Sequence, residues 1–338
     1  MLWAVLGAGG LALLHVPAGA LIGAMVATGA AALAKRPVEA PGWALGPLFV
    51  LTGTATGSAV TPEALGAAAL WPFSLVALVG ATALLTGAGY AIFRRFGGCD
   101  RQTAFFAAAP GALTAVIVLA EAEGADMTRV AIAQTLRLAV LAAVAPLALS
   151  TVHSPAPLHD GAGLVGAAGW GLTAAAALAG GLIARALKWP AALFLGPMAA
   201  VGALHGCGLV GAAFPPWALT LISGALGATV GLRFRGVDVK DLLRFLPASL
   251  AALLAMAAIG LAAGWLAGTL SGVGPAAGMI AFAPGSMDVM IAISLALGAS
   301  PAYVAAHHTV RFLGLMLGLP TLAEWLRRGG RARDAKTV

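Results

Sequence analysis

Long runs of apolar residues, separated by short polar connectors, follow one another along the whole chain. A run of about 20 apolar residues is long enough to cross a bilayer as an α-helix. The connectors often carry Arg or Lys, as at Lys35 and Arg94. This pattern predicts an all-α polytopic membrane protein. The predicted segments lie near residues 2–14, 18–34, 42–60, 67–92, 102–120, 130–150, 162–184, 190–205, 216–232, 245–268, 273–297 and 302–324.

The two halves of the chain repeat one pattern, so we predict an internal duplication. A shift of 174 residues aligns the halves. Glycines four positions apart, which permit close helix packing, recur in both. The aligned pairs include Pro110 with Pro284, Gly111 with Gly285, Gln134 with His308, Arg137 with Arg311, Gly53 with Gly227, and Gly57 with Gly231. The predicted organisation is a first membrane repeat (1–150), a linker (151–160), a second membrane repeat (161–326) and a basic cytoplasmic tail (327–338).

The positions of the cations predict how the chain is oriented. Arg and Lys concentrate in cytoplasmic loops, and Pro and Gly readily break a helix. If the Pro-Gly segments near 102–120 and 273–297 each enter and leave on one face, every connector cation lies on the cytoplasmic side. We therefore predict two inverted repeats, each with about five transmembrane helices plus one Pro-Gly-broken segment. A re-entrant hairpin and a discontinuous span both remain open, and both termini are expected to be cytoplasmic.

Composition narrows the class of protein further. Apolar residues make up 61% of the 338 residues and charged residues only 9%, against about 25% in a typical soluble domain. A soluble enzyme or nucleic-acid-binding domain could not cover so much apolar surface. The net charge of +7 comes from scattered cations and a basic C-terminus, which suits anionic lipid at the bilayer surface. We expect no nucleic-acid partner.

The two Pro-Gly breaks are the predicted centre of function. In transporters built from inverted repeats, broken helices meet near the bilayer midplane, where freed backbone groups bind the substrate. Irregular backbone at that depth is stable only inside the protein or beside a water-filled cavity. The predicted substrate-binding residues in the two breaks are Pro110, Gly111 and Thr114 in the first half and Pro284, Gly285, Ser286 and Asp288 in the second.

Two arginines lie well inside predicted membrane helices, and both are candidate substrate-binding residues. A charge at that depth is costly, so Arg137 and Arg311 should face the protein interior and have partners. Asp288 is the expected partner of Arg311, and either Glu121 or backbone carbonyls of the broken segment are the expected partners of Arg137. The arginines could capture an anion, or they could lock helix ends in place.

Gln134 and His308 precede the two arginines by one helical turn and complete the candidate binding set. A histidine within a membrane helix can relay protons, although it can equally be a hydrogen-bonded member of a polar core. The histidines show no His-x-His or Glu-x-x-His spacing, so we predict no metal site. We also predict no catalytic residue, no cofactor and no enzymatic activity.

A Pro-Gly pair, a Gly-Ala pair and a helix with a central Arg follow one another once in each half, at 110–146 and 284–320. This arrangement resembles the AbrB-type integral membrane family, whose members are often labelled ammonia monooxygenases, and the resemblance extends over nearly the whole chain. It implies a multi-pass protein of the bacterial cytoplasmic (inner) membrane. It also implies kinship with antiporter- and symporter-like folds that use inverted repeats.

The leading functional hypothesis is a secondary transporter or exporter of a small polar or anionic solute. Coupling to H⁺ or Na⁺ and alternating access are expected, with Asp288 and His308 as candidate coupling residues and a homodimer as one expected assembly. The alternative is a membrane-embedded ligand sensor that regulates gene expression without transport. A membrane monooxygenase is less favoured, because the sequence offers no cluster of histidines and carboxylates suited to copper.

Overall fold

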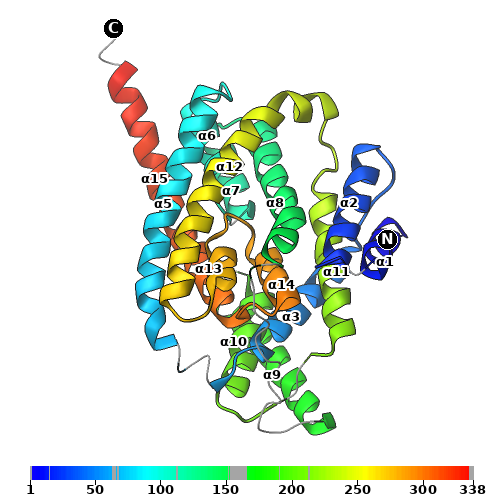
Figure 1. Cartoon of the computed structure of the whole chain (residues 1–338). Coiled ribbons are helices and arrows are strands. Elements are labelled where there is room, and N and C mark those ends of the chain that lie inside the picture. The colour runs from blue at the N-terminus through cyan, green and yellow to red at the C-terminus, as the bar shows by residue number, and fades with distance from the viewer. Residues whose placement is uncertain are drawn as a thin grey trace.

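The computed structural model describes residues 2–14, 16–62, 66, 68–111, 113–150, 152, 166–189, 191–211 and 214–334, and these form an all-helical protein (Figure 1). In the first half the elements are α1 (Leu2–Leu13), α2 (Gly19–Leu33), α3 (Gly42–Ser58), the short 3₁₀ helix η1 (Ala68–Leu70), α5 (Trp71–Arg95), α6 (Arg101–Ala108), α7 (Leu113–Ala122) and α8 (Met127–Leu149). In the second half they are α9 (Gly166–Ala186), α10 (Ala192–Gly206), α11 (Pro216–Leu232), α12 (Val239–Leu270), α13 (Pro275–Phe282), α14 (Met287–Leu297) and α15 (Pro301–Asp334).

Among the described residues, four helices are long and apolar enough to cross a membrane: α5, α8, α9 and α12. Most of α5, α9 and α12 faces outward, whereas α8 is largely buried, and exposed apolar residues such as Phe73, Val76 and Leu254 cover α5 and α12. An apolar surface of this kind is stable against lipid and unfavourable in water. The helices therefore have the character of a membrane protein, as the apolar runs predict.

Two parts of the predicted organisation need comment. The linker 151–160 lies outside the described residues except for Val152. The described residues of the expected tail, 327–334, continue the last helix, α15, which runs from Pro301 to Asp334.

The helices pack in two groups. The first group contains α1, α2, α3, α9, α10 and α11, and the second contains α5 to α8 and α12 to α15. Figure 1 shows α1, α2 and α11 together on the right, and α5 and α12 side by side on the left. Each group takes equivalent helices from both halves of the chain, so neither half forms a separate body.

Glycines at aligned positions make close backbone contacts in the first group. A Cβ on Gly53 of α3 would overlap the carbonyl oxygen of Phe194 in α10, and a Cβ on Gly227 of α11 would overlap the carbonyl oxygen of Leu21 in α2. Gly57 and Gly231 repeat the arrangement one turn further on. These predicted small-residue positions therefore allow backbones to touch. Both contacts join a helix of one half to a helix of the other.

Helices α5 and α12, which occupy equivalent places in the two halves, run antiparallel. Near the end of α5, Phe93 stacks on Phe245 near the start of α12, with ring centroids 5.6 Å apart. Gly89, one turn earlier in α5, lies against Met256, which comes 11 residues later in α12 than Phe245. The two helices cross the second group side by side in opposite directions (Figure 1).

Candidate functional site

Both Pro-Gly pairs interrupt a helix, as the sequence predicts. The first helix of each pair ends two residues before the proline, at Ala108 for α6 and at Phe282 for α13. The backbone is then extended at Ala109 (ψ 121°) and Ala283 (ψ 139°), because the residue before a proline disfavours the helical region. Each break exposes the last carbonyls of one short helix and the first N–H groups of the next.

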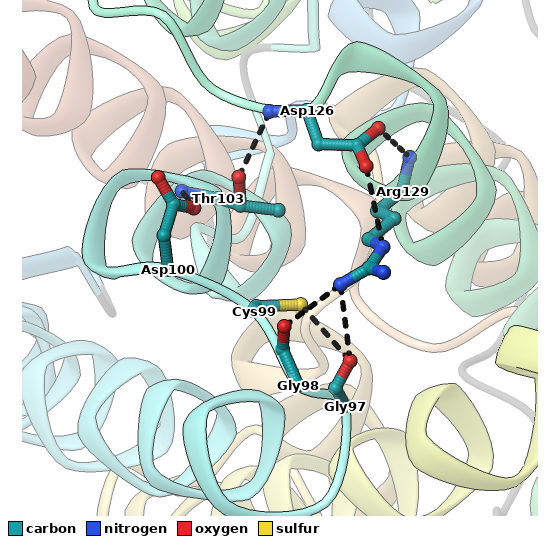
Figure 2. Close-up of polar contacts among 7 residues, drawn as sticks. All are labelled: Gly97, Gly98, Cys99, Asp100, Thr103, Asp126 and Arg129. Carbon is teal, nitrogen blue, oxygen red and sulfur yellow. Dashed lines mark hydrogen bonds and ion pairs between the residues drawn. The ribbon is translucent and has the colours of Figure 1, made fainter.

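The first broken segment doubles back on itself. Its outer ends are joined by a hydrogen bond of 2.8 Å from the Asp126 backbone N–H, just after α7, to Oγ1 of Thr103 in the first turn of α6. Arg129 donates to the Gly97 and Gly98 carbonyls before α6 and pairs with Asp126 (Figure 2). Helix α6 therefore begins close to the place where α7 ends.

Cys99 lies in this junction, on the loop before α6 (Figure 2). Its thiol is buried and lies 3.7 Å from the Gly97 carbonyl oxygen. Burial raises the pKa of the Cys99 thiol, and this outweighs the nearby Arg129 cation. The sulfur is therefore held protonated and serves as a weak donor to the loop.

The tips of the two broken segments meet inside the molecule. A Cβ on Gly111 would lie 4.0 Å from the carbonyl oxygen of Gly285. The positive φ of Gly111 (83°) is one that residues with a side chain rarely adopt, so glycine suits this turn. Because these residues come from opposite halves of the chain, the duplication places two breaks at a single site.

Arg137 holds the end of α6. Its guanidinium donates to the carbonyl oxygens of Ala107 and Ala108, each at 3.3 Å, and of Ala109 at 2.9 Å. These carbonyls form the negative end of the α6 dipole and have no partner within the helix. Arg137 is 6% exposed. Of the two partners expected for it, the structure shows backbone carbonyls.

Arg311 does the same for α13. It donates to the carbonyl oxygens of Ala283 at 2.8 Å, Gly285 at 3.2 Å and Phe282 at 3.5 Å. The expected ion pair between Arg311 and Asp288 is wrong, since the described residues include no such pair. The row of free carbonyls lies directly beside Arg311, whereas Asp288 begins the next helix.

Gln134 and His308 orient the two arginines in the same way. The Gln134 amide N–H₂ donates to the carbonyls of Phe106 (2.7 Å) and Ala109 (2.9 Å), and its oxygen accepts from Arg137. His308 has its Nε2 3.0 Å from the Ile280 carbonyl, and its Nδ1 accepts from Arg311 at 2.7 Å. Because Arg311 can only donate, the histidine is neutral with its proton on Nε2. An amide can therefore do what this imidazole does.

We expect His308→Gln to keep the stability of the parent protein, because the amide can donate to Ile280 and accept from Arg311. His308→Ala should lower the free energy of unfolding by about 1–3 kcal/mol, since it leaves a buried carbonyl and an arginine N–H without partners. Thermal unfolding of the purified variants measures this. The pH dependence of any transport should also survive in His308→Gln. A glutamine variant as unstable as the alanine variant would contradict a positioning role.

A cavity of about 580 Å³ lies at the meeting point of the two tips. Its walls come from both helix groups, through Phe49 of α3 and Phe194 of α10 on one side and the two broken segments with α14 and α15 on the other. Of the predicted binding residues, those that line it are Pro110, Gly111, Gly285, Ser286, Asp288, His308 and Arg311. Pro284, Gln134 and Arg137 are not among the lining residues, and the side chain of Thr114 lies outside the described residues.

Sequence reasoning missed two cations of this cavity. Arg185 lies in the last turn of α9 and is exposed, Arg233 follows α11 and is half-buried, and both line the cavity. Asp288 stands in the first turn of α14, where the helix dipole favours a carboxylate, and it attracts Arg233. The position of Arg233 could have been suspected from the shortness of α11, which has 17 residues.

A second polar cluster lies beyond His308. His307 is fully buried, with Nε2 2.8 Å from Oγ of Ser74 and Nδ1 2.9 Å from the Tyr303 carbonyl. The Tyr303 hydroxyl and Nε1 of Trp71 are buried without a hydrogen-bond partner, and the two rings meet edge to face at 5.4 Å. Unsatisfied groups of this kind mark a place where water or a proton can be held.

Taken together, the fold and site define an all-helical membrane protein in which two broken helices surround one cationic cavity. The chain belongs to the AbrB family, since the family model described as "Transition state regulatory protein AbrB" matches residues 4–327. This confirms the predicted resemblance. The Escherichia coli (strain K12) protein named "Putative regulator AbrB" is 26% identical over 337 residues, which cover 95% of this chain and 93% of the relative. "Uncharacterized protein YhjN" of Bacillus subtilis (strain 168) is 26% identical over 277 residues, covering 74% and 70%.

Proposed function

We propose that the protein is a secondary transporter that moves a small anionic solute across the membrane by alternating access. The observation that carries this proposal is the meeting of two helix breaks, one from each half, at a cavity with three arginines. Broken helices at a central site are typical of secondary transporters, where helix ends and freed backbone groups bind the solute. The proposal includes coupling to H⁺ or Na⁺.

Inverted repeats are part of this proposal, and several contacts support them. The equivalent helices α5 and α12 run antiparallel. Helix α3 runs parallel to α10, and α2 runs parallel to α11, since successive glycines contact successive positions of the partner. In the aligned halves α10 corresponds to α2, and successive spans such as α2 and α3 run in opposite directions. Inversion of the second repeat would therefore make α10 parallel to α3. Each repeat would contribute about five spans and one re-entrant hairpin.

The two helix groups supply a mechanism for alternating access. The cavity lies between them, so a movement of one group along the other would carry the solute past the α3 and α10 wall. Arg137 and Arg311 keep each hairpin tip attached to its own group during that movement. Asp288 is the favoured coupling residue, because it is a carboxylate in the cavity and can bind H⁺ or Na⁺.

The proposal places the protein in the bacterial inner membrane with both termini in the cytoplasm. The connector cations support this orientation, since Lys35, Arg94 and Arg235 would all be cytoplasmic. A homodimer is compatible with the broad apolar surface of the outer helices.

Flux through proteoliposomes tests the proposal. A panel of radiolabelled small anions should include solutes whose uptake depends on an imposed H⁺ or Na⁺ gradient. Asp288→Asn should remove the gradient dependence and leave solute exchange, because the amide cannot take up a proton and holds Na⁺ poorly. Asp241→Asn, which changes an exposed carboxylate in the first turn of α12, is the matched control. Gradient-driven uptake at parental level in Asp288→Asn would exclude Asp288 from coupling.

A sensor that regulates gene expression without transport is the second candidate, and the name "Putative regulator AbrB" of the Escherichia coli relative favours it. Such a protein would use the same cavity to bind a ligand and the same helix groups to change shape. Saturable binding with no flux for any bound anion would favour the sensor over the transporter.

A further inference from the structure

We infer that the cavity between the two helix groups binds an organic anion, in which an acidic head group is attached to an apolar body. The inference deepens the proposed function, on which it rests for the solute being carried, because it names the chemical class of that solute. Four features of the lining lead to it: unneutralised cations, helix N-termini, an unpartnered hydroxyl and an aromatic wall.

The charge of the lining favours an anion. Arg185, Arg233 and Arg311 face a single carboxylate, Asp288. All hydrogen-bond partners of the Arg311 guanidinium are neutral, since they are backbone carbonyl oxygens and the imidazole of His308. The structure describes no side-chain hydrogen bond or ion pair for Arg185 or Arg233. Three arginines and one carboxylate give the described lining an excess of two positive charges. Arg185 is exposed, but Arg311 is buried and Arg233 is half-buried, and cations withdrawn from water in this way need a counter-charge.

Two helix N-termini add to this field. The first turns of α10 and α14 both line the cavity, and neither Ala191 nor Ser286, their N-cap residues, makes a side-chain capping hydrogen bond. The first N–H groups of a helix and its dipole favour an anion. Oγ of Ser286 is itself buried without a hydrogen-bond partner. A ligand oxygen placed here would satisfy both the hydroxyl and the uncapped N–H groups.

The rest of the wall is apolar, which argues against an inorganic ion as the ligand. Phe49, Phe194 and Phe312 line the cavity beside the cations. Its volume of about 580 Å³ falls within the range of small-molecule sites, about 300–1,000 Å³. A sulfate or phosphate would leave most of this volume and all of the aromatic surface unused. A carboxylate or sulfonate on an aromatic or aliphatic body would contact both parts.

Equilibrium binding of radiolabelled 2-naphthoate to the full-length protein in lipid nanodiscs tests the inference. Binding should be saturable, and neither the neutral 2-naphthalenemethanol nor inorganic sulfate should displace it at equal concentration. Arg233→Gln should weaken binding at least tenfold. Arg235→Gln is the matched control, because Arg235 is exposed, pairs with Glu39 at 3.0 Å and lies outside the cavity lining; this variant should bind as the parent does.

A second pair of variants tests the apolar wall. Phe49→Ala should weaken binding of 2-naphthoate several-fold, whereas Phe73→Ala, on the exposed face of α5, should leave it unchanged. Displacement of 2-naphthoate by sulfate as readily as by unlabelled 2-naphthoate would overturn the inference. Equal displacement by the neutral alcohol would overturn it as well.

Failure of this inference can be told apart from failure of the proposed function. If 2-naphthoate binds with the expected variant pattern but no bound anion is carried across proteoliposomes, the inference stands and the transport proposal is wrong. If gradient-driven flux of another solute is found while 2-naphthoate does not bind, the transport proposal stands and the organic-anion inference is wrong.

Discussion

Replacement of Arg137 by methionine is expected to lower the free energy of unfolding by roughly 3–5 kcal/mol, because several buried acceptors lose their donor at once. Methionine fills a similar volume but has no donor. The carbonyls of Ala107 and Ala108 and the oxygen of Gln134 would then be buried without this partner, while the Ala109 carbonyl would keep only its bond from Gln134. Each unsatisfied buried group costs about 1–3 kcal/mol. The broken end of α6 should separate from α8.

Chemical or thermal unfolding of the purified protein measures this effect. Arg235→Met is the control, since its exposed pair with Glu39 should contribute less than about 1 kcal/mol. Arg137→Lys should fall between the two, because an ammonium keeps the charge but cannot reach several carbonyls with a planar fork of donors. If Arg137→Met has the same free energy of unfolding as Arg235→Met, the carbonyl contacts do not stabilise the first broken segment.

Replacement of Gly227 by valine should have the second large effect, through packing. The new Cβ would overlap the Leu21 carbonyl oxygen, which belongs to the rigid backbone of α2 and cannot rotate away. Overpacking of a tight contact typically costs about 1–3 kcal/mol, and here a whole helix pair must move apart. Gly53→Val should behave alike, because it meets the Phe194 carbonyl in the equivalent place.

The control for this prediction is Gly87→Val in α5, where an added Cβ meets no atom within 4 Å. Size-exclusion profiles and thermal unfolding of the purified variants compare the three substitutions. If both Gly227→Val and Gly53→Val were as stable as the parent protein, the packing of α2 on α11 and of α3 on α10 would not depend on backbone contact.

The aligned sites show how the two halves have diverged while keeping one architecture. Gln134 and His308 make the same contacts to an arginine and to a short-helix carbonyl, although one is an amide and the other an imidazole. Thr114 stands where the second half has Asp288. The hairpin-supporting contacts are therefore common to both halves, whereas the charged groups of the cavity come from the second half.

Several features of this protein follow from the sequence alone. Apolar length places the helices, and the chemistry of Pro and Gly places the two breaks at Ala109 and Ala283, because both effects act within a few residues. The 174-residue shift predicts that equivalent positions should make equivalent contacts, and Gly53 and Gly227 do so. The depth of Arg137 and Arg311 in apolar segments predicts buried partners.

Only the tertiary structure decided which partners those arginines have and which residues surround the cavity. Backbone carbonyls at a helix end can accept hydrogen bonds from a buried arginine in place of a carboxylate. Where these carbonyls lie depends on how α6 packs on α8 and how α13 packs on α15. Arg185 and Arg233 line the cavity because the last turn of α9 and the end of α11 lie beside the second broken segment. Local hydropathy determines where helices form, whereas the contacts between helix ends arise from packing between segments far apart in the chain.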